Sequence, residues 1–135
     1  DNPTDVLLLQ EELAEVASPR VTLAPVSTLK DALRLLESNS YDAILLDLGL
    51  PDSQGLGALN RLHHAFSSVP ILILSGLSNQ DVAMQSVQMG AQDYLLKSEL
   101  TGRALVRALL YAIERQRNRD MLQRSREFYI SLLEG

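Results

Sequence analysis

Three short apolar runs, each followed at once by a polar residue, constrain the fold of this chain more than any other feature. The runs are residues 43–46, 71–74 and 94–96, and the residues that follow them are Asp47, Ser75 and Lys97. Runs of this length indicate strands that are covered on both faces of a parallel sheet. A carboxylate such as Asp47 is costly in that setting unless it lies at the exit of the strand and has partners. The pattern therefore indicates that Asp47 is a functional residue rather than part of the hydrophobic core.

Helical segments alternate with these runs. The first begins at residues 2–5, where Asn2 suits the N-cap and Pro3 the first helical position, and we expect it to reach about Ala17. A short strand is predicted at Val21 to Ala24. Further helices are expected from about Thr28 through Leu36, from Gly55 to Phe66, from Ser78 to Gly90, and from about Thr101 onward.

Strands that alternate with helices across short loops predict an α/β fold with a doubly wound parallel sheet. The carboxyl ends of parallel strands meet at one edge of such a sheet, and ligands bind there. We therefore expect Asp47, Ser75 and Lys97 to converge, although they lie far apart in the sequence. Taken singly, each also fits an ordinary role, with Asp47 capping the following turn, Ser75 as a turn hydroxyl and Lys97 as a surface charge.

The composition limits the class of protein. A chain of 135 residues with 46% hydrophobic content suits one compact domain with an extension. No apolar stretch approaches the length of a membrane span, and the lack of cysteine excludes a disulfide framework and a thiolate metal site. The net charge of −5 disfavours general nucleic-acid binding. These observations predict a cytoplasmic protein with no direct contact to nucleic acid or membrane.

Three stretches of the sequence match a known pattern in order and spacing. They are residues 42–56 (DAILLDLGLPDSQGL), 70–76 (PILILSG) and 90–97 (GAQDYLLK). Through them the chain resembles the receiver domain of two-component response regulators, over about residues 1–114. The resemblance implies a flavodoxin-like receiver fold with the strand order 2-1-3-4-5.

The resemblance also implies roles for particular residues. Asp47 would be the phosphoacceptor, a carboxylate nucleophile that takes a phosphoryl group from a histidine kinase or a phosphotransfer protein. Lys97 would pair with the phosphoryl oxygens as a point charge, and Ser75 would turn its hydroxyl toward them. Ser75 and Tyr94 would form the switch, with Tyr94 changing rotamer after phosphorylation. A protein of this kind has at most weak autophosphatase activity, so we do not predict an enzyme.

A Mg²⁺ ion is a further implication of the resemblance, because a hard divalent cation offsets the repulsion between the carboxylate and the incoming phosphoryl group. The family's ligands correspond to Asp1, Asp47 and the backbone carbonyl of Gly49. In this alignment the first strand of the family lies upstream or is missing. The alternative takes Val6 to Leu9 as the first strand and Gln10-Glu11 as the acidic pair, which leaves almost no room for the first helix.

One departure from the family lies beside the predicted site. Ser98 follows Lys97 where the family usually has proline, so we expect no cis peptide bond, since non-proline cis bonds cost about 2.5 to 4 kcal/mol. Two other functions stay open: a pseudo-receiver that acts as an interaction or dimerisation module without efficient phosphotransfer, and a small hydrolase with Asp47 as nucleophile. No second acid is placed near Asp47 for general acid or base work, which disfavours the hydrolase.

The chain continues beyond what a receiver needs. We expect residues 1–114 to form the receiver domain and residues 115–135 a helical connector that leads to an output or sensory domain. Apolar residues recur in the connector at three- and four-residue steps, which predicts a homodimer through a coiled coil, with a frayed helical tail as the alternative. Residues 125–135 also resemble the lead-in helix of a PAS sensory domain. The stripe consists of Met121, Leu122, Ser125, Phe128, Tyr129, Leu132 and Leu133.

Overall fold

Five α-helices, three β-strands and one short 3₁₀ helix make up the described part of the chain. The computed structural model describes residues 3–14, 16, 21–48, 56–76 and 80–134, with side chains from Leu7 to Arg124 and at Arg126 within those ranges. In chain order the elements are α1 (Pro3–Ala14), α2 (Leu29–Ser38), β1 (Ile44–Asp47), α3 (Gly57–Ala65), β2 (Ile71–Ser75), α4 (Gln80–Gln88), β3 (Asp93–Leu96), η1 (Lys97–Glu99) and α5 (Gly102–Glu134).

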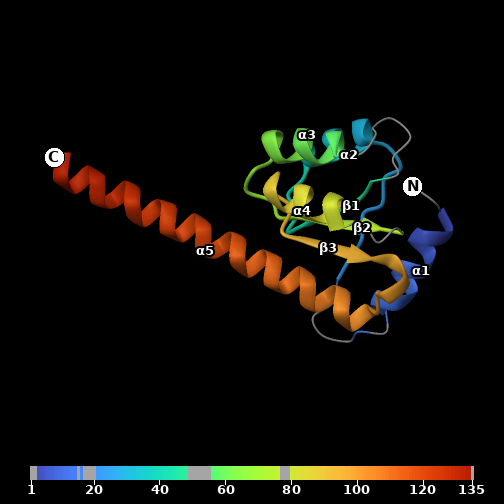
Figure 1. Ribbon diagram of the computed structural model, residues 1–135. Helices are drawn as coiled ribbons and strands as arrows, with labels where there is room; N and C mark the ends of the chain where they lie inside the picture. The colour runs from blue at the N-terminus through green and yellow to red at the C-terminus, as the bar shows by residue number, and fades with distance from the viewer. Residues whose placement is uncertain (1–2, 15, 17–20, 49–55, 77–79, 135) are drawn as a thin grey trace.

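The three strands form one parallel sheet in the order β1-β2-β3. The central strand β2 has four buried apolar residues in succession, as its unbroken apolar sequence predicts. Helices α2 and α3 lie on one face of the sheet, and α1 and the first half of α5 lie on the other (Figure 1). The predicted doubly wound α/β fold is confirmed, and the carboxyl ends of the three strands share one edge.

Each face of the sheet has its own hydrophobic core. On one face, Leu46, Ile71 and Ile73 of the strands pack with Leu59 and Leu62 of α3. The opposite core joins α1 and α5 to Leu72, through Leu13, Leu105, Val106, Leu109 and Ala112. Successive strand residues point to opposite faces, so neighbours in the sequence of β2 contribute to different cores.

The strand predicted at Val21 to Ala24 does not form. Residues 21–26 have no regular secondary structure, although Val21 and Leu23 are half-buried and pack against the α1–α5 core. A strand needs a hydrogen-bonded neighbour, and in the order 2-1-3-4-5 this segment would pair with the family's first strand. The prediction was wrong because an alternating apolar pattern favours a strand but does not show whether a neighbouring strand is there to pair with it.

The observed helices match the predicted ones, with ends that differ by a few residues. Helix α1 is already helical over residues 6–9, which excludes the alternative that makes Val6 to Leu9 a strand, and it ends at Ala14 rather than Ala17. Thr28 is the N-cap of α2, as predicted, and its hydroxyl accepts a hydrogen bond from the Asp31 amide at 3.1 Å. The predicted caps Asn2 and Ser78 lie outside the described residues.

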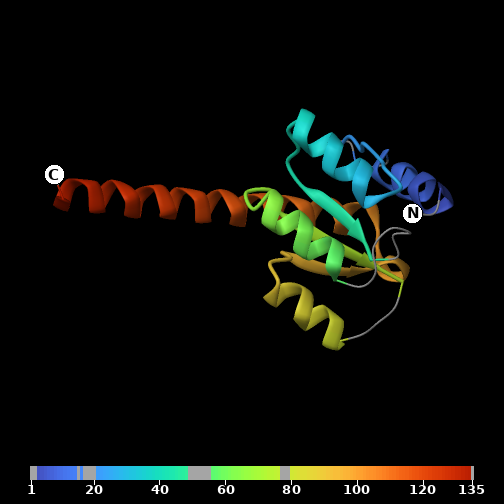
Figure 2. The same ribbon diagram turned by 90° about the horizontal axis from the view of Figure 1, so that it is seen from above.

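Helix α5 is far longer than the domain requires. Its 33 residues span about 50 Å at 1.5 Å per residue, and its second half projects from the body of the protein (Figures 1 and 2). None of the described helices is both long enough and apolar enough to cross a membrane. The extended C-terminal helix predicted from the sequence is confirmed.

Candidate functional site

Asp47 is the last residue of β1 and lies at the carboxyl edge of the sheet. It is opposite Leu74 of β2 in the parallel register, and Leu46 before it is buried in the core. The burial of Leu46 thus fixes the backbone immediately before Asp47. The Asp47 side chain keeps 20% of its surface exposed, so it is shielded by the protein but still reachable from solvent.

Lys97 contacts Asp47 directly. The Nζ atom of Lys97 lies 2.6 Å from Oδ2 of Asp47, and both side chains are mostly buried, with 29% and 20% of their surface exposed. Salt screens such a pair less than an ion pair on the open surface. Lys97 directly follows Leu96, the last residue of β3, so two strand ends bring the ammonium and the carboxylate together. The predicted convergence of these two residues is therefore observed.

Ser75 and Tyr94 come from neighbouring strands and share a face of the sheet. Tyr94 pairs with Ile73 in the register between β2 and β3, and Ser75 is two residues after Ile73. Because side chains alternate along a strand, Ile73, Ser75 and Tyr94 point to the same side. Tyr94 is half-buried against the core that contains Leu46. Both predicted switch residues thus come from strands of the sheet that carries Asp47, and Ser75 directly follows Leu74, the residue opposite Asp47.

A pocket of about 340 Å³ lies beside Tyr94, between α4, β3 and the start of α5. It was not predicted from the sequence, since its walls come from α4, β3, η1 and α5, whose packing no local pattern encodes. A change of rotamer by Tyr94 would alter the wall of this pocket. Its lining consists of Gln80, Ala83, Tyr94, Leu95, Leu96, Glu99, Leu100 and Ala104.

The predicted metal ligands are only partly within the described chain. Asp1 and Gly49 lie outside the described residues, and Asp47 is the one ligand whose position is known. Among the described residues, no three acidic, histidine or cysteine side chains are grouped to hold a metal ion. The Asp47 carboxylate is an oxygen ligand of the kind that Mg²⁺ prefers, so its chemistry fits this ion.

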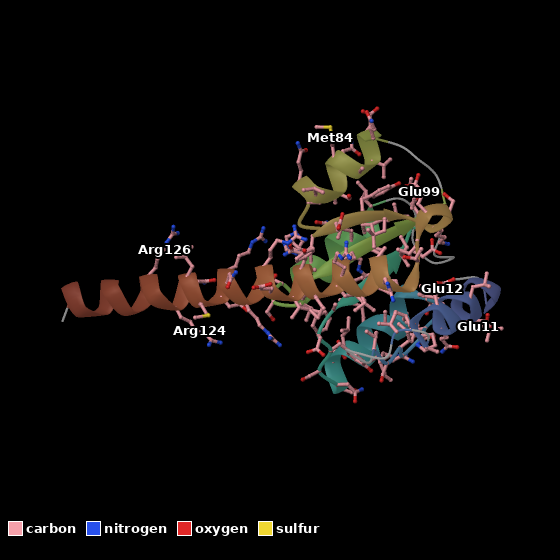
Figure 3. The ribbon with its side chains drawn as sticks, turned by 90° about the horizontal axis from the view of Figure 1, so that it is seen from below. Glu11, Glu12, Met84, Glu99, Arg124 and Arg126 are labelled. Atoms are coloured by element: carbon pink, nitrogen blue, oxygen red, sulfur yellow. The ribbon has the colours of Figure 1, made fainter. Side chains whose placement is uncertain are left out.

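The connection from the site to α5 is short. Lys97 begins the 3₁₀ helix η1, and the amide of Leu100 donates to the Lys97 carbonyl at 3.4 Å. Helix α5 then starts at Gly102, whose amide donates to Oε2 of Glu12 in α1 at 3.0 Å. Glu12 lies beside the start of α5 (Figure 3). Sequence reasoning missed this contact, because nothing in the sequence relates two residues so far apart.

Comparisons with known proteins agree with this geometry. The family model of the response regulator receiver domain matches residues 1–109. Among curated proteins, the transcriptional regulatory protein BasR of Escherichia coli (strain K12) is 36% identical over 110 residues, which cover 78% of this chain and 49% of that protein. The cell cycle transcriptional regulator CtrA of Caulobacter vibrioides is 47% identical over 57 residues, which cover 42% of this chain and 25% of that protein. The chain thus spans about half the length of BasR and less of CtrA.

Solved structures share the fold. The signal receiver domain of an HD domain-containing protein from Pseudomonas fluorescens Pf-5 superposes with a TM-score of 0.75 at 25% identity, covering 89% of this chain and 86% of that one. The receiver domain of the Francisella response regulator 1452 superposes with a TM-score of 0.69 at 24% identity, covering 82% and 91%. The second likeness supports the fold alone.

Proposed function

Because the chain belongs to the response regulator receiver domain family, we propose that it is a phosphoacceptor that receives a phosphoryl group on Asp47 from a histidine kinase. The observation that carries this proposal is the 2.6 Å contact between the Lys97 ammonium and the Asp47 carboxylate at the carboxyl edge of the sheet. Receiver domains generally act as phosphoacceptors rather than as classical enzymes, and we propose the same for this chain.

The proposed transfer is a nucleophilic displacement at phosphorus. An Asp47 carboxylate oxygen forms a bond to the phosphorus, and the bond from phosphorus to the histidine nitrogen breaks, with its electron pair returning to the imidazole. The product is an acyl phosphate on Asp47. Lys97 lies beside Asp47 at the end of β3. It is proposed to pair with the phosphoryl oxygens, where its charge would offset the negative charge that the phosphoryl group brings to the carboxylate.

Asp1, Asp47 and the carbonyl of Gly49 are the residues proposed to hold Mg²⁺. The ion would neutralise part of the negative charge on the reacting groups. Ser75 is proposed to donate its hydroxyl to the phosphoryl group, and Tyr94 to change rotamer in response. The register that puts Ser75 and Tyr94 on one face of the sheet supports this pairing of roles.

The functional unit is proposed to be a dimer of two copies that meet through α5, joined to an output or sensory domain.

Acetyl phosphate separates the candidate functions. The intact chain is incubated with acetyl phosphate and Mg²⁺, and its mass is followed beside that of the Asp47→Asn variant. A mass increase of one phosphoryl group in the parent chain and none in the variant supports the phosphoacceptor. No increase in either chain overturns it in favour of a pseudo-receiver. Continuous release of phosphate from small esters, lost in Asp47→Asn, would indicate a hydrolase instead.

A further inference from the structure

The root of the projecting half of α5 is fixed to the body of the protein by amide side chains. Nε2 of Gln92, in the loop before β3, lies 3.5 Å from Oε1 of Gln116, and Nε2 of Gln116 donates to Oδ1 of Asp120 at 3.2 Å. Leu105, Leu109 and Ala112 are buried earlier on the same side of the helix. These contacts define which face of α5 points toward the body.

The opposite face of α5 is exposed and carries large apolar side chains. Successive helical residues are rotated by about 100°, so Asn118 lies about 200° around from Gln116. Tyr111 and Leu122 lie on that same outward side, and each keeps 57% of its surface exposed. Met121, beside them, is 67% exposed. Because helices of this size gain most of their stability from packing an amphipathic face, this side of α5 requires a partner.

The sequence along the outward face has the spacing of a coiled coil. Positions 118, 122, 125, 129 and 132 follow one another at alternating four- and three-residue steps and carry Asn, Leu, Ser, Tyr and Leu. We propose that this outward seam packs against the same seam of a second copy in a parallel, in-register pair of α5 helices. The two receiver bodies then lie on the outer sides of the pair, since the seam faces away from Gln116.

Charge selects both the partner and the register. When Asn118 and Leu122 lie in the seam, Glu114 lies at a position that flanks it. In a parallel pair of helices, this position is next to residue 119 of the other helix, so Glu114 can pair with Arg119 of the partner subunit. Both side chains are exposed and available for this pair. Each possible seam has a charged core residue one heptad earlier, Arg115 before Leu122 and Glu114 before Met121, so either seam begins at Asn118. The flanking pair of opposite charges, Glu114 and Arg119, forms only in the seam through Leu122. Charge therefore favours this seam.

Basic residues beyond this point stay outside the proposed seam. Arg124 and Arg126 point to opposite sides of the projecting helix in Figure 3. In the register through Leu122 neither occupies a core position, so their charges remain in solvent. The seam rests on the α5 dimer of the proposed function and specifies its residues and orientation. Its test uses the unphosphorylated chain, so failure of the seam is distinguishable from failure of the phosphoacceptor role.

Disulfide formation tests the seam, because the chain contains no cysteine. The full chain is prepared with Asn118→Cys and, separately, with Gln123→Cys, which is rotated by about 100° from Leu122 toward the body-facing side of α5. Under mild oxidation we expect a covalent dimer from Asn118→Cys and a monomer from Gln123→Cys. Equal cross-linking of both variants, or none of Asn118→Cys, would overturn the parallel in-register pair.

Charge reversal provides the second test. Glu114→Arg and Arg119→Glu should each weaken the dimer roughly tenfold, because two ion pairs per dimer become repulsive. The double variant should return the dissociation constant toward that of the parent chain. Sedimentation equilibrium measures all four chains, and circular dichroism checks that helix content is unchanged. A parent chain that is monomeric at every concentration, or a double variant no tighter than the singles, contradicts the proposal.

Discussion

The amide of Gly102 donates a hydrogen bond to the carboxylate of Glu12 at 3.0 Å, which joins the first turn of α5 to the last turn of α1. Gly102 is buried, and a Cβ atom at this position would collide with the backbone carbonyl oxygen of Glu12. A backbone atom cannot swing away as the end of a flexible side chain can. The close approach of the two helices therefore requires glycine.

We predict that Gly102→Ala destabilises the protein by about 1 to 3 kcal/mol, the usual cost of inserting extra atoms into a packed site. Urea unfolding followed by circular dichroism measures the change in the free energy of unfolding. Gly76→Ala is the matched control, because nothing lies within 4 Å of a Cβ atom built there, and it should change stability by no more than about 0.5 kcal/mol. Equal effects of the two substitutions would contradict the close packing at Gly102.

The charge of Lys97 is predicted to matter for phosphorylation. Lys97→Gln retains a long polar side chain but removes the ammonium that contacts Asp47, and we expect the rate of phosphorylation by acetyl phosphate to fall on the order of 100-fold. Intact-mass measurements over time give this rate. Lys30→Gln, on the exposed surface of α2, is the control and should keep the rate of the parent chain. A normal rate in Lys97→Gln would show that the charge of Lys97 does not contribute to phosphoryl transfer.

The convergence of Asp47 and Lys97 was predictable because it depends on local patterns and one general rule. Each apolar run predicts where a strand ends, and parallel strands place their carboxyl ends at one edge. The register then brings the two residues together, although 50 positions separate them. No knowledge of any particular side-chain contact is needed for this inference.

Contacts between elements were not predictable in the same way. Glu12 and Gly102 are separated by 90 positions, and neither belongs to a repeating pattern that would relate one to the other. The failure at Val21 to Ala24 has a similar origin, since a strand exists only where a neighbour accepts and donates its hydrogen bonds. Local sequence therefore predicted elements and edges, while contacts between elements depended on the packing of the whole domain.

The N-cap of α2 gives a prediction about local stability. The Thr28 hydroxyl accepts a hydrogen bond from the Asp31 amide at 3.1 Å, which satisfies one of the unpaired amides at the start of the helix. We expect Thr28→Ala to lower the free energy of unfolding by about 1 kcal/mol. Thr28→Ser, which keeps the hydroxyl, should stay close to the parent chain. Thermal and urea unfolding compare the three, and equal losses in both variants would show that the hydroxyl is not the cause.

Gly90, in the turn that follows α4, has a positive φ of 111°, a conformation that residues with a side chain rarely adopt. A Cβ atom there would also lie 2.6 Å from Nε2 of His63 on α3. Gly90→Ala is thus opposed by backbone strain, which costs about 1 to 3 kcal/mol, and by the His63 ring. His63→Ala in the same chain should recover only the steric part, so the double variant should be more stable than Gly90→Ala and less stable than His63→Ala. Urea unfolding of the three variants tests this order. Full recovery would show that the ring, and not the backbone, demands glycine, whereas no recovery would assign the whole cost to the positive φ.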